Sequence, residues 1–206
     1  ELVRAATADD RAPVSVIGPG TGLGVAMVVP GSDGPVTVGT EGGHMAFPPC
    51  NDIELALWHY LARDHDLVYS ELLLSGRGLC RISDFLVAET GSGVSGMAPA
   101  EITEAALAGE PDSVRTVHLF LSILGSVAGD VALCHGALGG VYLGGGIVRR
   151  VTPLLETSDF CERFVAKGRM RGYLERIPVR LITADRVARR GAAWLFAQHR
   201  AGRPTP

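Results

Sequence analysis

Four glycines alternate with other residues in the stretch VIGPGTGLGVAMVV, which covers residues 16–29; they are Gly18, Gly20, Gly22 and Gly24. Glycine clusters occur where a chain turns tightly or where its backbone approaches a ligand such as phosphate closely. The dinucleotide and P-loop fingerprints each require a set spacing and a following helix, and this stretch has neither. The β-branched residues that follow predict a strand, so the expected structure is strand, glycine turn, strand.

A hairpin tip of this composition has two interpretations. Successive backbone N–H groups in a turn form a nest that binds phosphate oxygens without a helix. A plain glycine-rich hairpin that binds nothing fits the same residues. Residue spacing alone leaves both interpretations open.

Glu41 and His44 form a second candidate group, in the sequence GTEGGHMAF. On a helix this spacing would suit a metal pair, but each of the two intervening glycines costs about 1 kcal/mol in a helix interior, so a loop is expected. A carboxylate and an imidazole on a loop suit neighbouring hydroxyl groups, because the carboxylate accepts hydrogen bonds and the imidazole donates or accepts them. This favours a sugar site, although a surface glutamate and a satisfied histidine in a turn explain the same residues.

Glu71 precedes three leucines in the sequence SELLLSGRGL, residues 70–79. The apolar run predicts a buried strand and a turn over residues 71–79. A charged residue beside such a strand usually points to water. A solvated side chain is therefore the simpler expectation for Glu71.

The composition is typical of a globular protein, with 206 residues, 47% of them apolar and 20% charged, and a net charge of −3. The length suits one domain or slightly more. Basic residues are scattered apart from the pairs 149–150 and 189–190, which are expected to be solvated, so no nucleic-acid surface is predicted. The most apolar region, residues 119–148, is interrupted by Asp130 and His135, and no membrane span is expected.

The cysteines lie about 30 residues apart, with no C-x-x-C pair and no histidine at ligand spacing; they are Cys50, Cys80, Cys134 and Cys161. They are expected to be free thiols in the core, as in a reducing compartment, and no structural metal site is predicted. The first residues lack the pattern of a signal peptide. These features favour a cytoplasmic location.

Three short strands are predicted at residues 14–17, 25–29 and 35–39, joined as an antiparallel meander. Helix and strand patterns alternate after the meander, which predicts an α/β fold with a mixed sheet covered by helices. Helices are expected from Asn51 or Asp52 to Leu61, over 100–108, over 112–135 and over 184–200, strands over 139–147 and 177–183, and a loop over 91–99.

Five motifs occur in the order and spacing of the bacterial glucokinase family, along nearly the whole chain: GPGTGLGVA, EGGHMAF, SELLLSGRGL, EITEAAL and YLGGGIV. The chain thus resembles that family, which belongs to the sugar-kinase, actin and Hsp70 superfamily. The resemblance implies an actin-like ATPase (ribonuclease H-like) domain. It also implies a protein in which two domains close over ATP and glucose, and a homodimer, since family members commonly form one.

The resemblance assigns roles to both candidate groups. Residues 18–24 match a phosphate-binding hairpin, with Thr21 and Gly22 beside the ATP phosphates, and Mg²⁺ is implied as the companion of the nucleotide. The turn that receives the adenosine matches Gly144, Gly145 and Gly146. The ligands of the sugar hydroxyls match Glu41, His44 and Glu71.

The chain also departs from the family pattern. Arg77 replaces the proline of SGPGL, and Arg149 replaces the proline of GGIVPR; both alter a loop without removing a ligand. The family's N-terminal domain, with its DxGGT loop and the catalytic aspartate of its NDF motif, has no counterpart, and Asn51-Asp52 is expected to cap a helix instead. The resemblance implies that residues 1–184 are the larger C-terminal domain, and that 185–206 form a helix that packs on the absent domain.

The expected function is ATP-dependent phosphorylation of glucose at its C6 hydroxyl, with the catalytic aspartate supplied from outside this chain. The isolated chain is expected to be inactive. The alternative is a non-enzymatic sugar- or nucleotide-binding module of the same superfamily, complete as it stands. Sugar-sensing repressors of the superfamily carry a helix-turn-helix and a cysteine-rich zinc motif, and this sequence shows neither. An upstream reading frame encoding DxGGT and NDF would favour the kinase.

Overall fold

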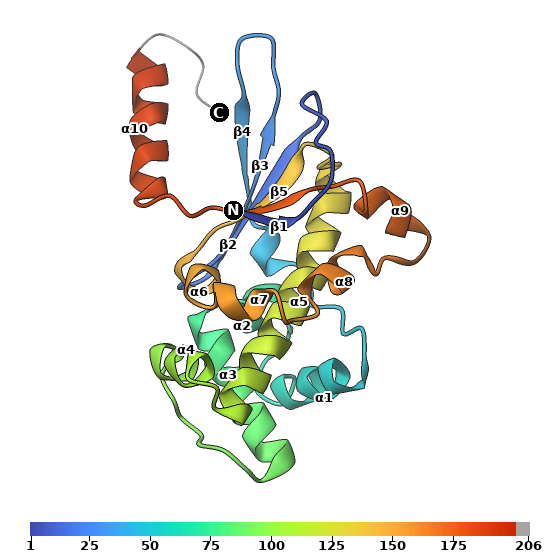
Figure 1. Ribbon diagram of the computed structural model, residues 1–206, viewed down its shortest axis with the longest axis vertical. Coiled ribbons are helices and arrows are strands. Elements are labelled where there is room, and N and C mark those ends of the chain that lie inside the picture. The colour runs from blue at the N-terminus through green and yellow to red at the C-terminus, as the bar shows by residue number, and fades with distance from the viewer. Residues whose placement is uncertain (201–206) are drawn as a thin grey trace.

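The computed structural model describes residues 1–200, without the side chains of 198–200, and residues 201–206 of the expected terminal segment lie outside the described residues. The described strands form one six-stranded mixed sheet in the order β1-β6-β5-β2-β3-β4 (Figure 1). Their bounds are β1 (Leu2–Arg4), β2 (Val14–Pro19), β3 (Leu23–Val29), β4 (Val36–Thr40), β5 (Gly140–Leu143) and β6 (Val179–Leu181).

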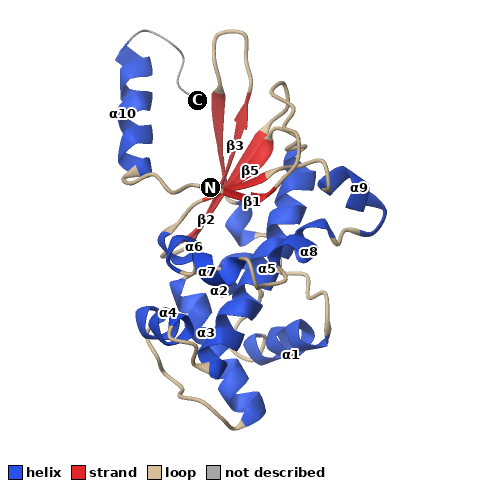
Figure 2. Cartoon of the chain, viewed as in Figure 1, coloured by secondary structure: helices blue, strands red, loops and turns tan. Residues whose placement is uncertain are grey.

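The helices gather mainly at one end of the sheet, and α10 stands on the other side of it (Figure 2). Their bounds are α1 (Asp52–Leu61), α2 (Ser70–Leu73), α3 (Gly76–Thr90), α4 (Pro99–Leu107), α5 (Pro111–His135), α6 (Gly146–Arg150), α7 (Thr152–Leu155), α8 (Phe160–Val165), α9 (Arg171–Leu174) and α10 (Val187–Arg200), with short 3₁₀ helices η1 (Gly42–His44) and η2 (Gly168–Met170).

The predicted antiparallel meander is confirmed as β2, β3 and β4. Alternate residues of β2 and β3 face opposite sides of the sheet. Ile17 and Val25 pair on the buried side, whereas Gly18 pairs with Gly24 on the opposite side. The two faces of this hairpin therefore differ: one packs into the core, and the other has no side chains at the Gly18–Gly24 pair.

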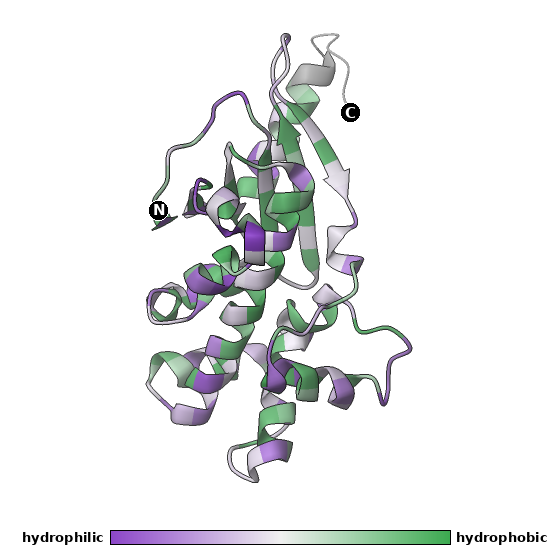
Figure 3. Ribbon diagram, turned by 90° about the vertical axis from the view of Figure 1, so that its right-hand side faces the viewer, coloured by the Kyte–Doolittle hydropathy of each residue, from purple (hydrophilic) through white to green (hydrophobic). Residues whose placement is uncertain are grey.

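The predicted long central helix is confirmed as α5. The Glu110 carboxylate accepts hydrogen bonds from two backbone N–H groups of the first turn, and Gly136 ends the helix with φ +60°. By length and hydropathy α5 could cross a membrane, but 67% of its most apolar window is buried inside the fold. Apolar residues run along the strands and the central helices in Figure 3. The helix is thus the core element around which the others pack.

The strand predicted over residues 71–79 is wrong, because this segment forms α2 and the start of α3. Leu72, Leu73 and Leu74 are buried, and a short apolar run does not distinguish a strand from a helix buried on all sides. The Ser75 side chain caps α3 by accepting a hydrogen bond from Gly78 N. A Cβ on Gly78 would collide with the carbonyl of Leu73, so this tight helical corner depends on glycine.

Smaller predictions had mixed outcomes. Asn51 caps α1 as expected, with its side-chain oxygen accepting a hydrogen bond from Glu54 N. All four cysteines are free, but Cys50 and Cys134 are exposed, so the prediction of core thiols is wrong for these two. Strand β1 was not predicted, because three residues carry too little pattern. The large apolar residues of α10 are exposed, including Trp194 at 43% and Phe196 at 64%, as a helix that packs on an absent domain would be.

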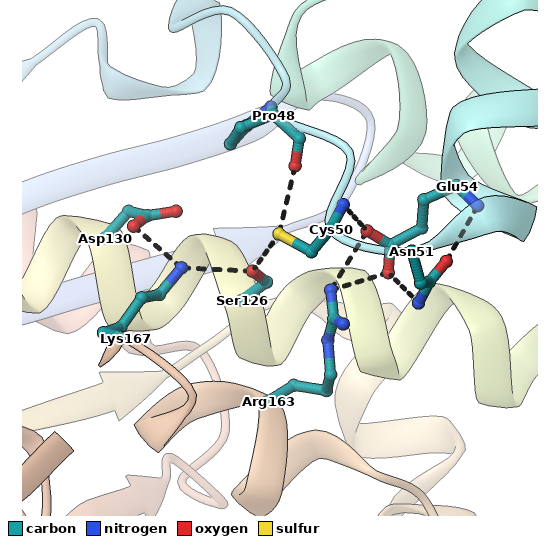
Figure 4. A network of polar contacts seen from close by, with 8 residues as sticks. All are labelled: Pro48, Cys50, Asn51, Glu54, Ser126, Asp130, Arg163 and Lys167. Carbon is teal, nitrogen blue, oxygen red and sulfur yellow. Dashed lines mark hydrogen bonds and ion pairs between the residues drawn. The ribbon is translucent and has the colours of Figure 1, made fainter. Parts of the chain in front are cut away.

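A buried ion pair joins α1 to α8, where it lies beside α5 (Figure 4). The Glu54 side chain is fully buried, and Arg163 Nη2 donates to its two oxygens at 2.7 and 3.0 Å. The backbone N–H of Cys50 and the side-chain amide of Asn51 donate to the same carboxylate. Burial of a charge is tolerated only when it is paired and hydrogen-bonded in this way.

Replacing Arg163 with Met should lower the free energy of unfolding by about 3–5 kcal/mol, because the Glu54 carboxylate would remain buried without its partner charge. Urea denaturation of the wild-type and variant chains measures this. The control is Glu104→Gln, which removes an exposed ion pair with Arg150 and should cost less than about 1 kcal/mol. Equal losses in the two variants would contradict a special contribution from the buried pair.

A second buried polar contact joins the end of α5 to the core face of β2. Ser15, which is fully buried, contacts Nδ1 of His135 through its hydroxyl oxygen at 2.8 Å. Burial lowers the pKa of His135 below its ordinary value. The folded protein therefore resists protonation of this ring more than the unfolded chain does.

Folding stability should fall as the pH drops below about 6.5, the ordinary pKa of histidine, because the unfolded chain then binds a proton that the folded chain excludes. The stability that the neutral His135 ring contributes is fully present above that pH. It is lost as the pH falls toward the lowered pKa of His135 in the folded chain. Urea unfolding at pH 7.5, 6.0 and 5.0 should show a smaller acid-induced loss for His135→Gln than for wild type. If wild type and His135→Gln lose the same unfolding free energy as the pH falls, His135 is not the cause of the acid-induced loss.

Candidate functional site

The glycine-rich hairpin packs backbone to backbone against a second glycine turn, far away in the sequence. Gly144 N donates to the carbonyl of Ile17 at 2.7 Å. A Cβ added to Gly18 would lie 3.6 Å from backbone atoms of Gly144 and Gly145. Gly145 has φ +86°, and a Cβ there would collide with the carbonyl of Pro19. The two glycine segments singled out in the sequence are therefore neighbours in space.

The tip of the hairpin is held by α2 and α3. Gly20 O accepts a hydrogen bond from Gly76 N at 2.8 Å, and Leu23 N donates to the Glu71 carboxylate at 2.7 Å. Within residues 1–200, neither Thr21 nor Gly22 uses its backbone N–H in a hydrogen bond. The tip thus has two successive backbone donors without a partner among the described residues, and an anion could accept hydrogen bonds from them.

The predicted tight turn is confirmed between Pro19 and Leu23, but none of the four hairpin glycines has a positive φ. Gly22 is bare for another reason: a Cβ there would collide with the Glu71 carboxylate. A Cβ on Gly18 would make only ordinary contacts, at 3.6 Å, with the backbone of Gly144 and Gly145. Among the four, Gly22 is therefore the glycine at which close approach excludes a side chain.

A cavity of about 500 Å³ lies on the bare face of the β2–β3 hairpin. Its floor includes Val16 and Ala26, one wall is the turn Gly144–Gly146, and the opposite wall is the segment 182–188 that leads into α10. These walls are mostly apolar or glycine. The cavity therefore suits an apolar group, and the glycines of its wall adjoin the hairpin.

The Glu41–His44 segment forms a single 3₁₀ turn, η1, rather than a helix that could hold a metal pair. A Cβ on Gly43 would collide with the carbonyl of Leu23, so the turn depends on glycine to pack against β3. The Glu41 carboxylate and His44 Nδ1 are 3.8 Å apart, and their side chains are 93% and 56% exposed. Both side chains are therefore accessible to a polar ligand.

Glu71 joins this group, so the expectation that its side chain points to water is wrong. Its carboxylate accepts a hydrogen bond from Leu23 N, and Leu23 is also the residue that Gly43 packs against. The His44 ring stacks on Tyr69 with 5.0 Å between ring centroids. Ser70 N donates to the carbonyl of Met45 at 2.9 Å, which fixes the turn to the start of α2. The structure thus brings Glu41, His44 and Glu71 together around the start of β3.

Sequence reasoning missed Tyr69, Gly76 and Arg149 as parts of these surroundings. Gly76 lies in a segment expected to be a turn, and its role depends on Gly20, which is remote in the sequence. Tyr69 follows Val68 in a short stretch that lacks a clear pattern. Arg149 was noted as a departure from the family motif, and that departure was the available signal.

Other reactive groups contribute little to the site. Burial raises the pKa of the Cys80 and Cys161 thiols, which disfavours the nucleophilic thiolate. Among the described residues, no cluster of three or more His, Cys, Asp or Glu side chains is placed to hold a metal ion. The site as described consists of backbone donors, an apolar cavity and a group of hydrogen-bonding side chains.

Comparison with known proteins gives the same family from sequence and from structure. The glucokinase family model matches residues 1–199. A glucokinase of Cupriavidus pinatubonensis is 48% identical over 95% of this chain and 58% of its own length. A glucokinase of Chromobacterium violaceum is 45% identical over 95% of this chain and 56% of its own length.

Solved structures agree. The crystal structure of a glucokinase from an Antarctic psychrotroph superposes with a TM-score of 0.86 at 36% identity, over 93% of this chain and 60% of that one. A glucokinase of the ROK family from Streptomyces griseus, at 20% identity and a TM-score of 0.55, shares the fold. The chain spans a little more than half the length of the curated relatives it matches. It has the actin-like ATPase fold of these sugar kinases and belongs to the glucokinase family.

Proposed function

We propose that this chain forms the larger domain of an ATP-dependent glucokinase, which transfers the γ-phosphoryl group of ATP to the C6 hydroxyl of glucose. The observation that carries the proposal is the convergence of two glycine segments and a carboxylate–imidazole group on one hairpin. The names of the relatives support the reaction. The proposal extends to a cytoplasmic enzyme that forms a homodimer.

The hairpin and the glycine turn would hold the nucleotide. Gly18 and Gly20 would leave the backbone open to the nucleotide, and the N–H groups of Thr21 and Gly22 would donate to the phosphates. Gly144, Gly145 and Gly146 would receive the adenosine, beside the apolar cavity. Backbone donors fixed before the reaction stabilise charge on the transferred group without reorganisation.

Glu41, His44 and Glu71 would hold the sugar. Carboxylates accept hydrogen bonds from two hydroxyls, and the imidazole completes the set as donor or acceptor. Because Glu71 also accepts the N–H of Leu23, the sugar-binding group is fixed relative to the hairpin tip. This arrangement would orient the C6 hydroxyl toward the phosphoryl group.

Two components would come from outside the described residues. Mg²⁺ would arrive with the nucleotide and neutralise phosphate charge; it commonly keeps several waters and binds through substrate phosphates, which fits a site without a cluster of acidic ligands. The aspartate that takes the proton of the C6 hydroxyl would come from the part of the relatives that this chain does not span. This chain's own residues bind and orient both substrates.

Replacing Glu41 with Gln should weaken glucose use by about ten- to a hundredfold in kcat/KM in the complete enzyme, because a charge-assisted hydrogen bond worth about 1.5–3 kcal/mol is lost. Steady-state kinetics at varied glucose and fixed ATP measure the effect. The control is Glu89→Gln, an exposed carboxylate at the end of α3. Unchanged glucose kinetics in Glu41→Gln would remove this residue from the site.

The 206-residue chain alone should not turn over ATP and glucose at a useful rate. A positioned general base contributes about 10²–10⁴ in rate, and the chain would also lack the second domain, whose closure aligns the reactants and excludes water. An assay that couples glucose 6-phosphate formation to NADPH measures turnover.

Adding the remaining N-terminal part of the enzyme as a separate polypeptide should restore some activity, which the same assay detects. Turnover by the isolated chain within tenfold of the complete enzyme would place the base inside this sequence. Binding of glucose or ADP without turnover, unchanged by the added part, would instead favour a binding module.

A further inference from the structure

Arg149 is the single charged side chain among the described residues that line the cavity. It lies in α6, three residues after Gly146. Building on the proposed function, we propose that Arg149, held in place by Asp185, forms the surface on which the purine base of the nucleotide stacks. The residue would then be a nucleotide-binding and base-selecting residue.

The ion pair leaves the flat faces of the guanidinium available. Arg149 Nη2 donates to Asp185 Oδ1 at 2.9 Å, and this is the one hydrogen bond that the described residues provide to the Arg149 side chain. The bond uses an edge of the planar group. A guanidinium bound at its edge stacks on aromatic rings through its face, by dispersion and cation–π attraction.

The surroundings favour a base over a phosphate at this end of the cavity. Val16, Ala26 and Ile182 supply apolar surface, which suits an aromatic ring. The Asp185 carboxylate offsets the charge of Arg149 and would repel a phosphate anion. The free N–H groups of the hairpin tip belong to Thr21 and Gly22, and neither residue lines the cavity. Phosphates are therefore assigned to the tip and the base to Arg149.

The same pair also connects two walls of the cavity. Arg149 follows the glycine turn, whereas Asp185 lies in the segment 182–188 of the opposite wall. Both side chains are exposed, Arg149 at 41% and Asp185 at 85%. The contact is consequently a local one at the mouth of the cavity, and its removal should leave the core of the fold intact.

Isothermal titration calorimetry of the 206-residue chain with ADP, UDP and inorganic tripolyphosphate tests the proposal. Arg149→Ala should weaken ADP binding by about three- to thirtyfold. It should weaken UDP binding less, because a pyrimidine offers a smaller ring, and should leave tripolyphosphate within about twofold of wild type. Arg149→Lys keeps the charge without the planar face and should fail to restore ADP affinity.

Asp185→Ala, which removes both the charge and the hydrogen-bond acceptor, separates the two roles of the pair. Without the carboxylate, Arg149 loses its fixed edge and its charge is no longer offset, so ADP binding should weaken while tripolyphosphate binding strengthens. Thermal unfolding of each variant should match wild type, which confirms that the changes in binding are not caused by misfolding.

Three results would overturn the inference. ADP affinity that is unchanged in a folded Arg149→Ala chain would exclude the contact. Loss of tripolyphosphate binding in Arg149→Ala, restored by Arg149→Lys, would make Arg149 a phosphate ligand instead. If the wild-type chain binds no ADP at all, the nucleotide half of the proposed function is wrong and this inference falls with it; either of the first two results leaves the proposed function standing.

Discussion

The close packing of the β2–β3 hairpin against the Gly144–Gly145 turn is the constraint on which the rest of the site depends. Backbone from two distant segments meets with no room for an intervening side chain, as the collision of a Cβ on Gly145 with the Pro19 carbonyl shows. Because β2 also pairs in parallel with β5, which ends at this turn, the sheet itself sets the distance. A bulky residue at this contact would separate the hairpin from the turn and widen the cavity between them.

The alternation of the strands explains how one hairpin serves both core and site. Residues on one face, such as Ile17 and Ser15, are fully buried, and Ser15 contacts His135 at the end of α5. Residues on the other face, Val16, Gly18 and Ala26, line the cavity. A shift of register by one residue would exchange these faces. The core contacts of α5 therefore also fix which residues the site presents.

Local patterns in the sequence predicted much of this architecture, and long-range contacts account for what was missed. The meander, the Asn51 cap and α5 follow from alternation, capping and helical periodicity, all of which act over a few residues. The leucines after Glu71 carry no such periodicity, and their helical state comes from burial on all sides. The partner of Glu71 is the N–H of Leu23, 48 residues earlier. A side chain whose partner is a backbone group so remote cannot be placed from spacing alone.

The hairpin tip links the two groups of candidate ligands physically. Leu23 N donates to the Glu71 carboxylate, and the carbonyl of Leu23 lies so near Gly43 that a Cβ there would collide with it. The N–H groups of Thr21 and Gly22, which have no partner among the described residues, come immediately before Leu23 in the chain. By accepting the hydrogen bond from Leu23 N, Glu71 satisfies a backbone donor that would otherwise compete for an anion. Since Gly43 packs against the same Leu23, that one residue connects Glu71 and the Glu41–His44 turn, the proposed sugar ligands, to the proposed phosphate-binding tip.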